Sequence, residues 1–369
     1  MKRLIAVLLL LTIIPNANAA ISVKPMVQLG AVDAAAIGVV ASNNAILTFG
    51  NRDKNGFAQI LNGATVDLTA GAESFVTAAN VDADGNFILV GAASKLITTT
   101  PPSTTGILNP DNVVPDPNSS NKSDANTLWY WKLDASGKIL DSQSMDMPST
   151  VIPRAVLADK FGITVAGVEA TSLVTSKTFV VNWNQTPTYL GKNSTKVFDI
   201  ARTSDGGVVA VGQSAEKLLD KPLKGKADGF LAKFLNGKVT NVQRSSDLNA
   251  NRGWVKTSST LLLGGFSNKS AVVTKFASNF SPIWTSSYPS LGSSLTATIG
   301  KANYAAFIPN GSIATLPTWR KKNLPLVLTF DNKGAITAAN YVNNPNFIGF
   351  TASATYGPIV MAGGFLYRA

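Results

Sequence analysis

One hydrophobic pattern recurs along the chain: a polar turn, then four or five consecutive apolar residues, then a glycine. Its closing glycines are Gly50, Gly91, Gly167, Gly212, Gly264, Gly311 and Gly363. The longest spacing contains a Pro-, Ser-, Thr- and Asn-rich stretch from Leu96 to Asn126, and without it the period is about 45 residues. The sixth copy is degenerate, because Pro309 interrupts it. A repeated period of this length is typical of proteins built from stacked units.

Each copy has further short apolar segments around it, one before and two after, with turns such as Asn236-Gly237 between them. Each unit therefore corresponds to four strands. Runs such as Val208–Val211 are continuously apolar, which indicates that both faces of the strand are buried. A sandwich would expose one face, and no segment has the period of a crossover helix. The pattern predicts an all-β fold, a β-propeller of seven four-stranded blades; a solenoid or a pair of sandwiches is the alternative.

The two ends of the repeat predict how the ring closes. The last unit, residues 347–369, has room for two or three strands, and the strand-like segment Ser22–Leu29 precedes the first full unit. We expect this segment to pair with the C-terminal sheet and complete the last blade. Pro25 suits an outer edge, because proline cannot donate a ladder hydrogen bond.

The N-terminus resembles a secretory signal peptide in three parts. Lys2 and Arg3 precede an apolar run from Leu4 to Ile14, and a small-residue site follows at 17–19. The run is shorter than the ~20 residues of a membrane span. We expect a signal peptide at 1–19, cleavage after Ala19, and one propeller domain at 20–369. The mature protein is then secreted, periplasmic or on the cell surface, without a transmembrane segment; a retained anchor is the alternative.

The fourth unit carries a resemblance to known proteins. Residues 199–213 read DIARTSDGGVVAVGQ and residues 228–238 read DGFLAKFLNGK. They resemble the bacterial β-propeller repeat families of exported and surface proteins. The second unit matches in part, and the other units match chiefly in strand spacing. The resemblance implies the fold and an exported protein. These repeats share no enzymatic activity, so it implies no catalytic residues.

The amino-acid composition excludes many catalytic and metal-binding chemistries. The chain of 369 residues contains no histidine and no cysteine, and its 32 Lys and Arg exceed its 21 Asp and Glu. Disulfides, thiol nucleophiles, iron–sulfur clusters and zinc–thiolate sites are excluded, and the commonest general base is missing. The basic residues are scattered, without a recognition helix or an aromatic–basic RNA motif, which argues against nucleic-acid binding. We expect a monomer without a cofactor.

Catalysis would have to use carboxylate, lysine, tyrosine or serine side chains. The three glutamates, Glu73, Glu169 and Glu216, fall in different units, and aspartates such as Asp134 lie in turns, where they cap their own backbone. A non-catalytic protein is favoured. The alternatives are a carbohydrate-active hydrolase or lyase that uses Asp with Tyr or Lys at the central channel, and a structural surface component.

One turn has the oxygen spacing of a calcium loop. Asn80, Asp82 and Asp84 alternate as the first ligands of such a loop do, but Gly91 stands where a bidentate glutamate is needed. An ordinary turn is the favoured interpretation, and no metal site is expected.

Long connections between the second and third strands are expected in units two, four and six, at 96–126, 213–227 and 312–323. In a propeller such loops emerge on one face. The second loop carries Lys217, Lys221, Lys224 and Lys226, and the third places Trp319 beside Arg320, Lys321 and Lys322. Cations next to an aromatic ring suit an anionic cell-envelope polysaccharide or an envelope partner protein. We therefore expect a binding scaffold; solvated loops without a ligand are the alternative.

Overall fold

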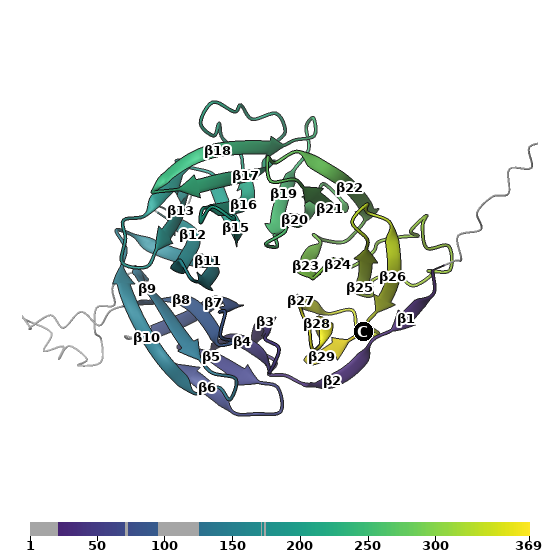
Figure 1. Cartoon of the computed structure of the whole chain (residues 1–369), viewed down its shortest axis with the longest axis horizontal. Helices are drawn as coiled ribbons and strands as arrows, with labels where there is room; N and C mark the ends of the chain where they lie inside the picture. The colour runs from purple at the N-terminus through teal and green to yellow at the C-terminus, as the bar shows by residue number, and fades with distance from the viewer. Residues whose placement is uncertain (1–20, 71–72, 95–124, 171, 173–174) are drawn as a thin grey trace, which may run out of the picture.

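The computed structural model describes residues 21–70, 73–94, 125–170, 172 and 175–369. The expected signal peptide and most of the loop 96–126 lie outside the described residues. Seven sheets surround a central channel, and the first strand of each repeat unit lies nearest the channel (Figure 1). The protein is thus an all-β, seven-bladed β-propeller, as the repeat predicts.

The first three blades follow one another in chain order. Blade one contains β3 (Ala36–Ala41), β4 (Ile46–Arg52), β5 (Asn55–Ile60) and β6 (Thr65–Leu68). Blade two contains β7 (Glu73–Val81), β8 (Phe87–Ser94), β9 (Thr127–Leu133) and β10 (Ile139–Asp146). Blade three contains β11 (Thr150–Asp159), β12 (Gly162–Ala170), β13 (Ser176–Asn182) and β14 (Thr188–Leu190).

Blades four and five repeat this order, and blades six and seven each include one strand from the N-terminal end of the chain. Blade four contains β15 (Thr195–Arg202), β16 (Val208–Ser214), β17 (Asp228–Leu235) and β18 (Lys238–Ser245). Blade five contains β19 (Arg252–Lys256), β20 (Leu262–Ser267), β21 (Ser270–Phe276) and β22 (Pro282–Pro289). Blade six contains β23 (Leu295–Ile299), β24 (Ala302–Phe307), β25 (Leu326–Phe330), β26 (Ile336–Tyr341) and β1 (Val23–Pro25). Blade seven contains β27 (Phe347–Ser353), β28 (Gly357–Ala362), β29 (Phe365–Arg368) and β2 (Val27–Ala31).

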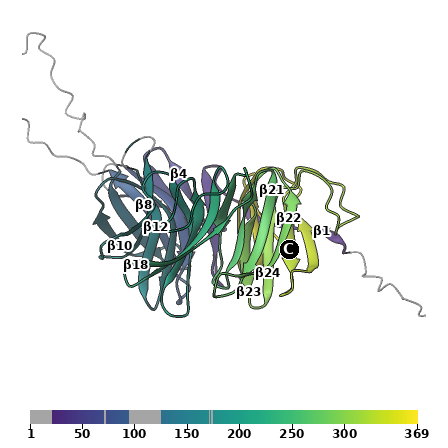
Figure 2. The same cartoon turned by 90° about the horizontal axis from the view of Figure 1, so that it is seen from above.

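The burial of the strands explains the apolar runs. The second strands lie between neighbouring blades, and β8 is buried at every residue from Phe87 to Ala93. The outer strand of the same blade, β10, is exposed along nearly its whole length. The edge-on view shows the sheets side by side across the disc (Figure 2). A sheet packed between two other sheets needs apolar residues on both faces of its central strands.

Four of the recurring glycines, Gly50, Gly91, Gly167 and Gly212, lie opposite β-bulges in the innermost strands. The register between β7 and β8 shifts between Val76 and Ala78, and Gly91 pairs with Val76 at that point. A Cβ atom on Gly91 would stand 1.9 Å from the carbonyl oxygen of Phe75, so no other residue fits. Gly212 faces the bulge of β15 in the same way, with a Cβ position 2.0 Å from the oxygen of Lys196.

Blade six has neither feature. Its first two strands, β23 and β24, pair without a register shift, and alanines stand in the central positions of β24. Gly311 lies beyond the end of β24. The degenerate sixth copy of the sequence pattern therefore marks the blade whose innermost pairing is regular.

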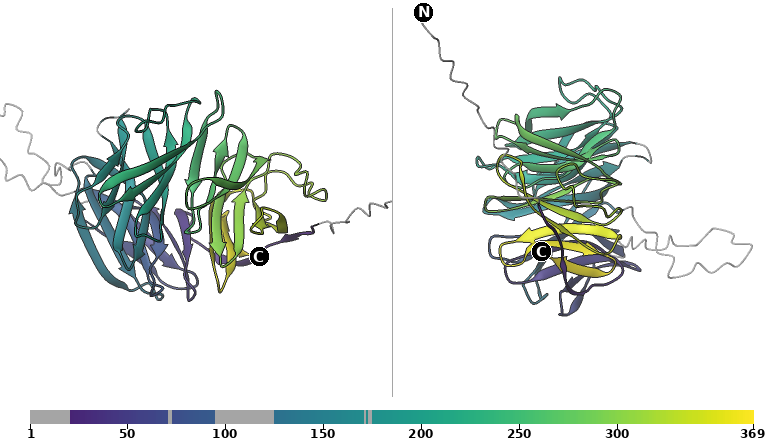
Figure 3. Two further views of the ribbon diagram at one scale, coloured as in Figure 1. Left: turned by 45° about the horizontal axis from the view of Figure 1, so that its top comes forward. Right: turned by 90° about the vertical axis from the view of Figure 1, so that its right-hand side faces the viewer.

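The N-terminal segment closes the ring, but over two blades. β2 pairs antiparallel with β29, as predicted for the C-terminal sheet. The prediction was wrong for the residues before it, because β1 pairs parallel with β26 of blade six. The purple segment runs along the outer edge of both blades (Figure 3). Two neighbouring blades each present an unpaired outer edge here, and one extended segment covers both.

Candidate functional site

The two faces of the disc differ in their connections. The innermost strands begin on one face, which we call the loop face. It carries the links between blades and the connections between second and third strands, including residues 215–227 in blade four and 308–325 in blade six. The opposite face carries the tight turns between first and second and between third and fourth strands, and we call it the turn face. The two described long loops thus share one face.

An apolar residue fixes the middle of the blade-four loop (residues 215–227). Leu218 is buried and belongs to the core cluster of blades three and four. Its N–H donates to the carbonyl of Lys221 at 3.1 Å, and the N–H of Lys221 donates back at 2.9 Å. Leu219, at the tip, has φ 48° and is exposed. The loop is therefore a folded structure with a buried anchor.

A buried ion pair fixes its C-terminal end. Nε of Arg244 donates to Asp228 at 2.9 Å, and the Asp228 side chain is fully buried. The same carboxylate accepts the N–H groups of Lys224 and Gly225 at 3.0 and 2.9 Å. Burial by itself would raise the pKa of Asp228, but these N–H groups and the charge of Arg244 outweigh it, so the pKa lies below its usual value. Arg244 also donates to the carbonyl of Glu216 at 2.6 Å, which joins both ends of the loop.

The N-terminal end is tied to the link from blade three. The Glu216 carboxylate accepts the N–H groups of Lys192 and Ser194 at 3.0 Å each, and the hydroxyl of Thr195 at 2.7 Å. Burial would raise the pKa of Glu216, but these hydrogen bonds and the one from Asn193 lower it below the usual value. Glu216 is therefore used to hold the loop and, among the described residues, makes no ion pair with the exposed lysines.

All four predicted lysines of this loop are exposed: Lys217, Lys221, Lys224 and Lys226. Lys221 lies 3.1 Å from the carboxylate of Asp220. The other three have no ion-pair partner among the described residues. The structure thus holds three unpaired cations on a loop whose backbone is fixed at both ends and in the middle.

Three further cations lie nearby that the sequence pattern did not indicate. A cleft of about 300 Å³ opens on the loop face between blades three and four, lined by Arg154 and Lys196 together with Ser172, Thr175 and Asn193. Both cations are exposed, and the described residues pair neither of them with an acid. Lys192 is also exposed and unpaired among the described residues, on the link that Glu216 holds. Arg154 is far from Lys192 and Lys196 in sequence, so only the packing of two blades gathers them.

The blade-six loop (residues 308–325) is held differently. Trp319 is only 3% exposed and packs with Ile313, Leu316 and the ring of Tyr341, 5.7 Å away. The N–H of Leu316 donates to Ile313 and that of Trp319 donates to Leu316, so two successive turns place three apolar side chains on one side. That spacing of three residues is the sequence signal for a buried tryptophan. The ring is part of the core and is not available to stack on a ligand.

The basic residues after Trp319 remain at the surface. Arg320, Lys321 and Lys322 are all exposed. Nη1 of Arg320 donates to the carbonyl of Trp319 at 3.3 Å, and Nζ of Lys321 lies 3.9 Å from the ring centre of Tyr341. Two of the three cations therefore have internal contacts.

The calcium-like turn uses its oxygens internally. Asp82 accepts the N–H groups of Asp84 and Asn86 at 3.0 and 2.9 Å, and its other oxygen lies 2.8 Å from Nζ of Lys132. Asn80 donates to the carbonyl of Val156 in blade three at 2.8 Å. Among the described residues no group of three or more acidic side chains could hold a metal ion. These contacts are those of a capped turn and of a blade-to-blade hydrogen bond.

The channel is lined by all seven innermost strands, and its cavity measures about 410 Å³. Two carboxylates line it, and both are paired. Asp159 accepts from Nε of Arg202 at 2.8 Å. Asp199 lies 3.2 Å from Nζ of Lys256 and accepts the N–H of Thr257 at 2.8 Å. Each ion pair joins two neighbouring blades, so these charges hold the blades together.

Comparisons with known proteins agree with this architecture. No protein family and no characterised sequence matches the chain. Among solved structures, virginiamycin B lyase from Staphylococcus aureus aligns with a TM-score of 0.55 at 8% identity, covering 93% of this chain and 98% of that chain. The Neurospora crassa Pan2 WD40 domain aligns at 0.54 with 10% identity, covering 95% and 97% of the two chains. The WD40 β-propeller domain of Doa1 aligns at 0.53 with 11% identity, covering 94% and 95%. At such identities the likeness shows the propeller fold alone.

Within the described residues, no helix has the length and apolar character that crossing a membrane requires.

Proposed function

We propose that the protein is an exported, non-catalytic scaffold that binds an anionic cell-envelope polymer through the loop face of blades three and four. Export rests on the N-terminal sequence, and the ligand class rests on the surface described above. An acidic envelope protein is the other partner that this surface suits.

One observation carries the proposal. Six exposed cations with no carboxylate partner among the described residues come from blades three and four and the links beside them. They are Arg154, Lys192, Lys196, Lys217, Lys224 and Lys226. Like charges held together on a fixed surface raise the local electrostatic potential, which attracts a polyanion over a distance of about one Debye length, ~8 Å at physiological salt.

The fixed backbone of the blade-four loop supports the proposed binding more strongly than the number of its lysines does. The ion pair of Asp228 with Arg244 and the hydrogen bonds to Glu216 hold the loop before any ligand arrives. A preorganised surface loses less conformational entropy on binding than a mobile one. The cleft beside Arg154 and Lys196 adds hydroxyl groups that can donate to anionic oxygens.

Chromatography on immobilised dextran sulfate tests the proposal, with neutral dextran as the reference matrix. We expect the wild-type protein to be retained on dextran sulfate and released by salt. The K217E/K224E/K226E variant should elute without retention, because reversal of three unpaired cations removes most of the attraction. The K321E/K322E variant should elute close to the wild-type protein, since these two lysines lie on blade six, outside the proposed surface.

A matched control separates a site from net charge. Lys138, Lys238 and Lys333 are exposed in turns of the turn face, and K138E/K238E/K333E makes the same change in net charge as the blade-four variant. This control should stay retained. Equal loss of retention in both triple variants would refute a dedicated loop-face site.

A further inference from the structure

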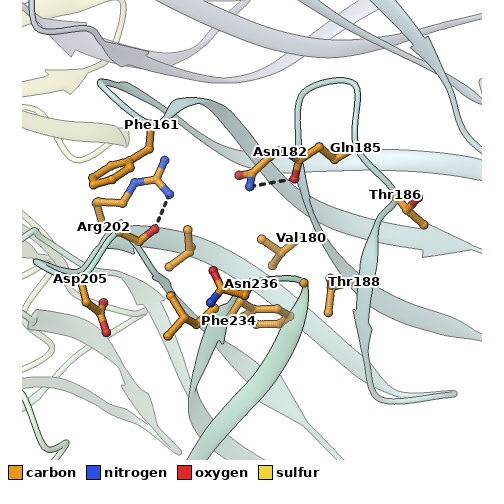
Figure 4. Close-up of a pocket in the computed structure, with 14 residues that line it drawn as sticks. Phe161, Val180, Asn182, Gln185, Thr186, Thr188, Arg202, Asp205, Phe234 and Asn236 are labelled. Carbon is orange, nitrogen blue, oxygen red and sulfur yellow. Dashed lines mark hydrogen bonds between the residues drawn. The ribbon is translucent and has the colours of Figure 1, made fainter.

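A polar cavity of about 350 Å³ opens on the turn face, at the seam between blades three and four (Figure 4). It exists because the outer strand of blade three is short. β14 has three residues, whereas the corresponding β18 of blade four has eight. The end of β13 beyond Val180 therefore has no outer partner. The uncovered edge forms one wall, and the turn at Asn236 and Gly237 in blade four forms the other.

A chain of hydrogen bonds holds the polar wall in place. Nη2 of Arg202 donates to the hydroxyl of Thr164 at 2.9 Å, and that hydroxyl donates to Oδ1 of Asn182 at 2.6 Å. Nδ2 of Asn182 then donates to Oε1 of Gln185 at 3.2 Å. This direction of donation leaves the amide N–H groups of Gln185 free. Arg202, on the seam between blades three and four, thus orients the side-chain amide of Gln185 at the rim of the cavity through this chain of hydrogen bonds.

The charged side chains that line the cavity are already paired. Arg202 donates through Nε to Asp159 at 2.8 Å and through Nη1 to the carbonyl of Gly206 at 3.3 Å, so all three of its nitrogens are engaged. Asp205, on the rim, pairs with Lys233. Among the described residues that line the cavity, an anion finds no free cation and a cation finds no free carboxylate. Lys160 is outside this lining, exposed, with its Nζ 5.1 Å from the ring centre of Phe161. The cavity therefore suits a neutral polar molecule.

The uncharged groups that line the cavity include amides, hydroxyls and the aromatic ring of Phe161, whose centre lies 5.4 Å from the guanidinium carbon of Arg202. The side chains of Thr186, Thr188 and Asn236 line the cavity and make no hydrogen bond to the described residues. Phe161 is 46% exposed, and its ring lies against Gly206, where a Cβ atom would stand 2.9 Å from a ring carbon. In Figure 4 this ring stands beside the guanidinium of Arg202, on the side of the cavity opposite Thr186.

We infer that this cavity binds one ring of a neutral saccharide, with its hydroxyl groups on Gln185 and Asn236 and an apolar face of the ring against Phe161. Sugar hydroxyls both donate and accept, as side-chain amides do. The volume lies at the lower end of the range for ligand pockets, which suits one ring. This site is separate from the loop face, and the inference does not depend on the proposed function.

Saturation-transfer NMR tests the inference with the methyl glycosides of glucose, galactose, mannose and N-acetylglucosamine, together with glucuronate and glucosamine as charged probes. We expect transfer to at least one neutral glycoside, with a Kd on the order of 1 mM, since a single ring makes few contacts. Transfer to charged probes alone, or to none of the probes, would overturn the inference.

Variants locate the binding. Gln185→Glu and Phe161→Ala should each weaken the neutral glycoside about tenfold, as loss of one well-placed contact does. Lys138→Ala, at an exposed position on the turn face of blade two, should bind as the wild type does. K217E/K224E/K226E should also bind normally, so failure of the loop-face proposal leaves this result unchanged. Thermal unfolding of each variant shows that it is folded, and unchanged affinity in both site variants would refute the assignment.

Discussion

The blade-four and blade-six loops look alike in sequence and differ in structure. Both are long connections between second and third strands, and both carry a run of cations. The blade-four loop is held by polar groups, chiefly Asp228 and Glu216, which leave its lysines free. The blade-six loop is held by Trp319, which packs into the core. A basic loop held by polar groups presents its cations as a charged surface, whereas a basic loop held by a buried aromatic ring packs over the end of its blade.

The largest expected effect comes from removing the polar anchor. Asp228→Ala leaves the buried charge of Arg244 without a carboxylate and the N–H groups of Lys224 and Gly225 without their acceptor, so we expect a loss of about 3–5 kcal/mol in the free energy of unfolding. Retention on dextran sulfate should fall as well, because the lysines lose their fixed arrangement. Urea unfolding and chromatography measure the two effects. Unchanged retention would show that the frame does not matter for binding.

Removing the apolar anchor should affect stability alone. Trp319→Ala creates a cavity beside Ile313, Leu316 and Tyr341, with an expected cost of about 3 kcal/mol. Retention of the folded protein on dextran sulfate should stay close to the wild-type value. Trp319→Phe provides a milder comparison, since it keeps a ring and removes an indole Nε1 that has no hydrogen-bond partner. A variant that folds but loses retention would mean that blade six takes part in binding.

The smallest expected effect depends on pH. The pKa of Glu216 in the folded protein lies below its usual value of 4.5, so its stabilisation is complete above that value and is lost as the pH falls through the folded pKa. Hydrogen bonds to a charged group of this kind contribute about 1.5–3 kcal/mol at most. Hydrogen exchange at Lys192, Asn193 and Ser194, corrected for intrinsic rates, should lose protection in that acid range.

The blade-six loop serves as the internal control for this effect. Residues 308–325 contain no acidic side chain, so protection at Leu316 and Trp319 should not follow the same titration. Glu216→Gln should remove the pH dependence at the blade-four link and leave blade six as it was. Parallel loss of protection in both loops would indicate general acid unfolding.

The repeat predicted much of the fold because each blade is a local unit. Four strands in about 45 residues pair with their sequence neighbours, so the hydrophobic pattern and the turn residues carry the information. Closure was less predictable. A strand-like segment at the N-terminus indicated the last blade, yet Val23–Pro25 pairs with blade six. The sequence of this N-terminal segment does not show how many blades it pairs with.

The candidate site, like the fold, could be predicted from the sequence only in part. Lys217, Lys224 and Lys226 are close together in sequence and were found there. Arg154 and Lys196 belong to different blades and come together in one cleft. Trp319 was predicted to lie beside the cations on the surface. Its neighbours at three-residue spacing bury it instead.

The sequence by itself determined the seven-unit propeller and the exclusion of histidine and cysteine chemistry, because strand period and composition are properties of the chain. Only the tertiary structure decided the meaning of the repeated glycines and the distribution of charge. Gly91 and Gly212 are required because a bulged neighbouring strand occupies the space of a side chain. Asp159 and Asp199 form ion pairs between blades because their cationic partners lie on the next blade. Such contacts depend on how blades pack, and packing between distant segments leaves no periodic signal in the sequence.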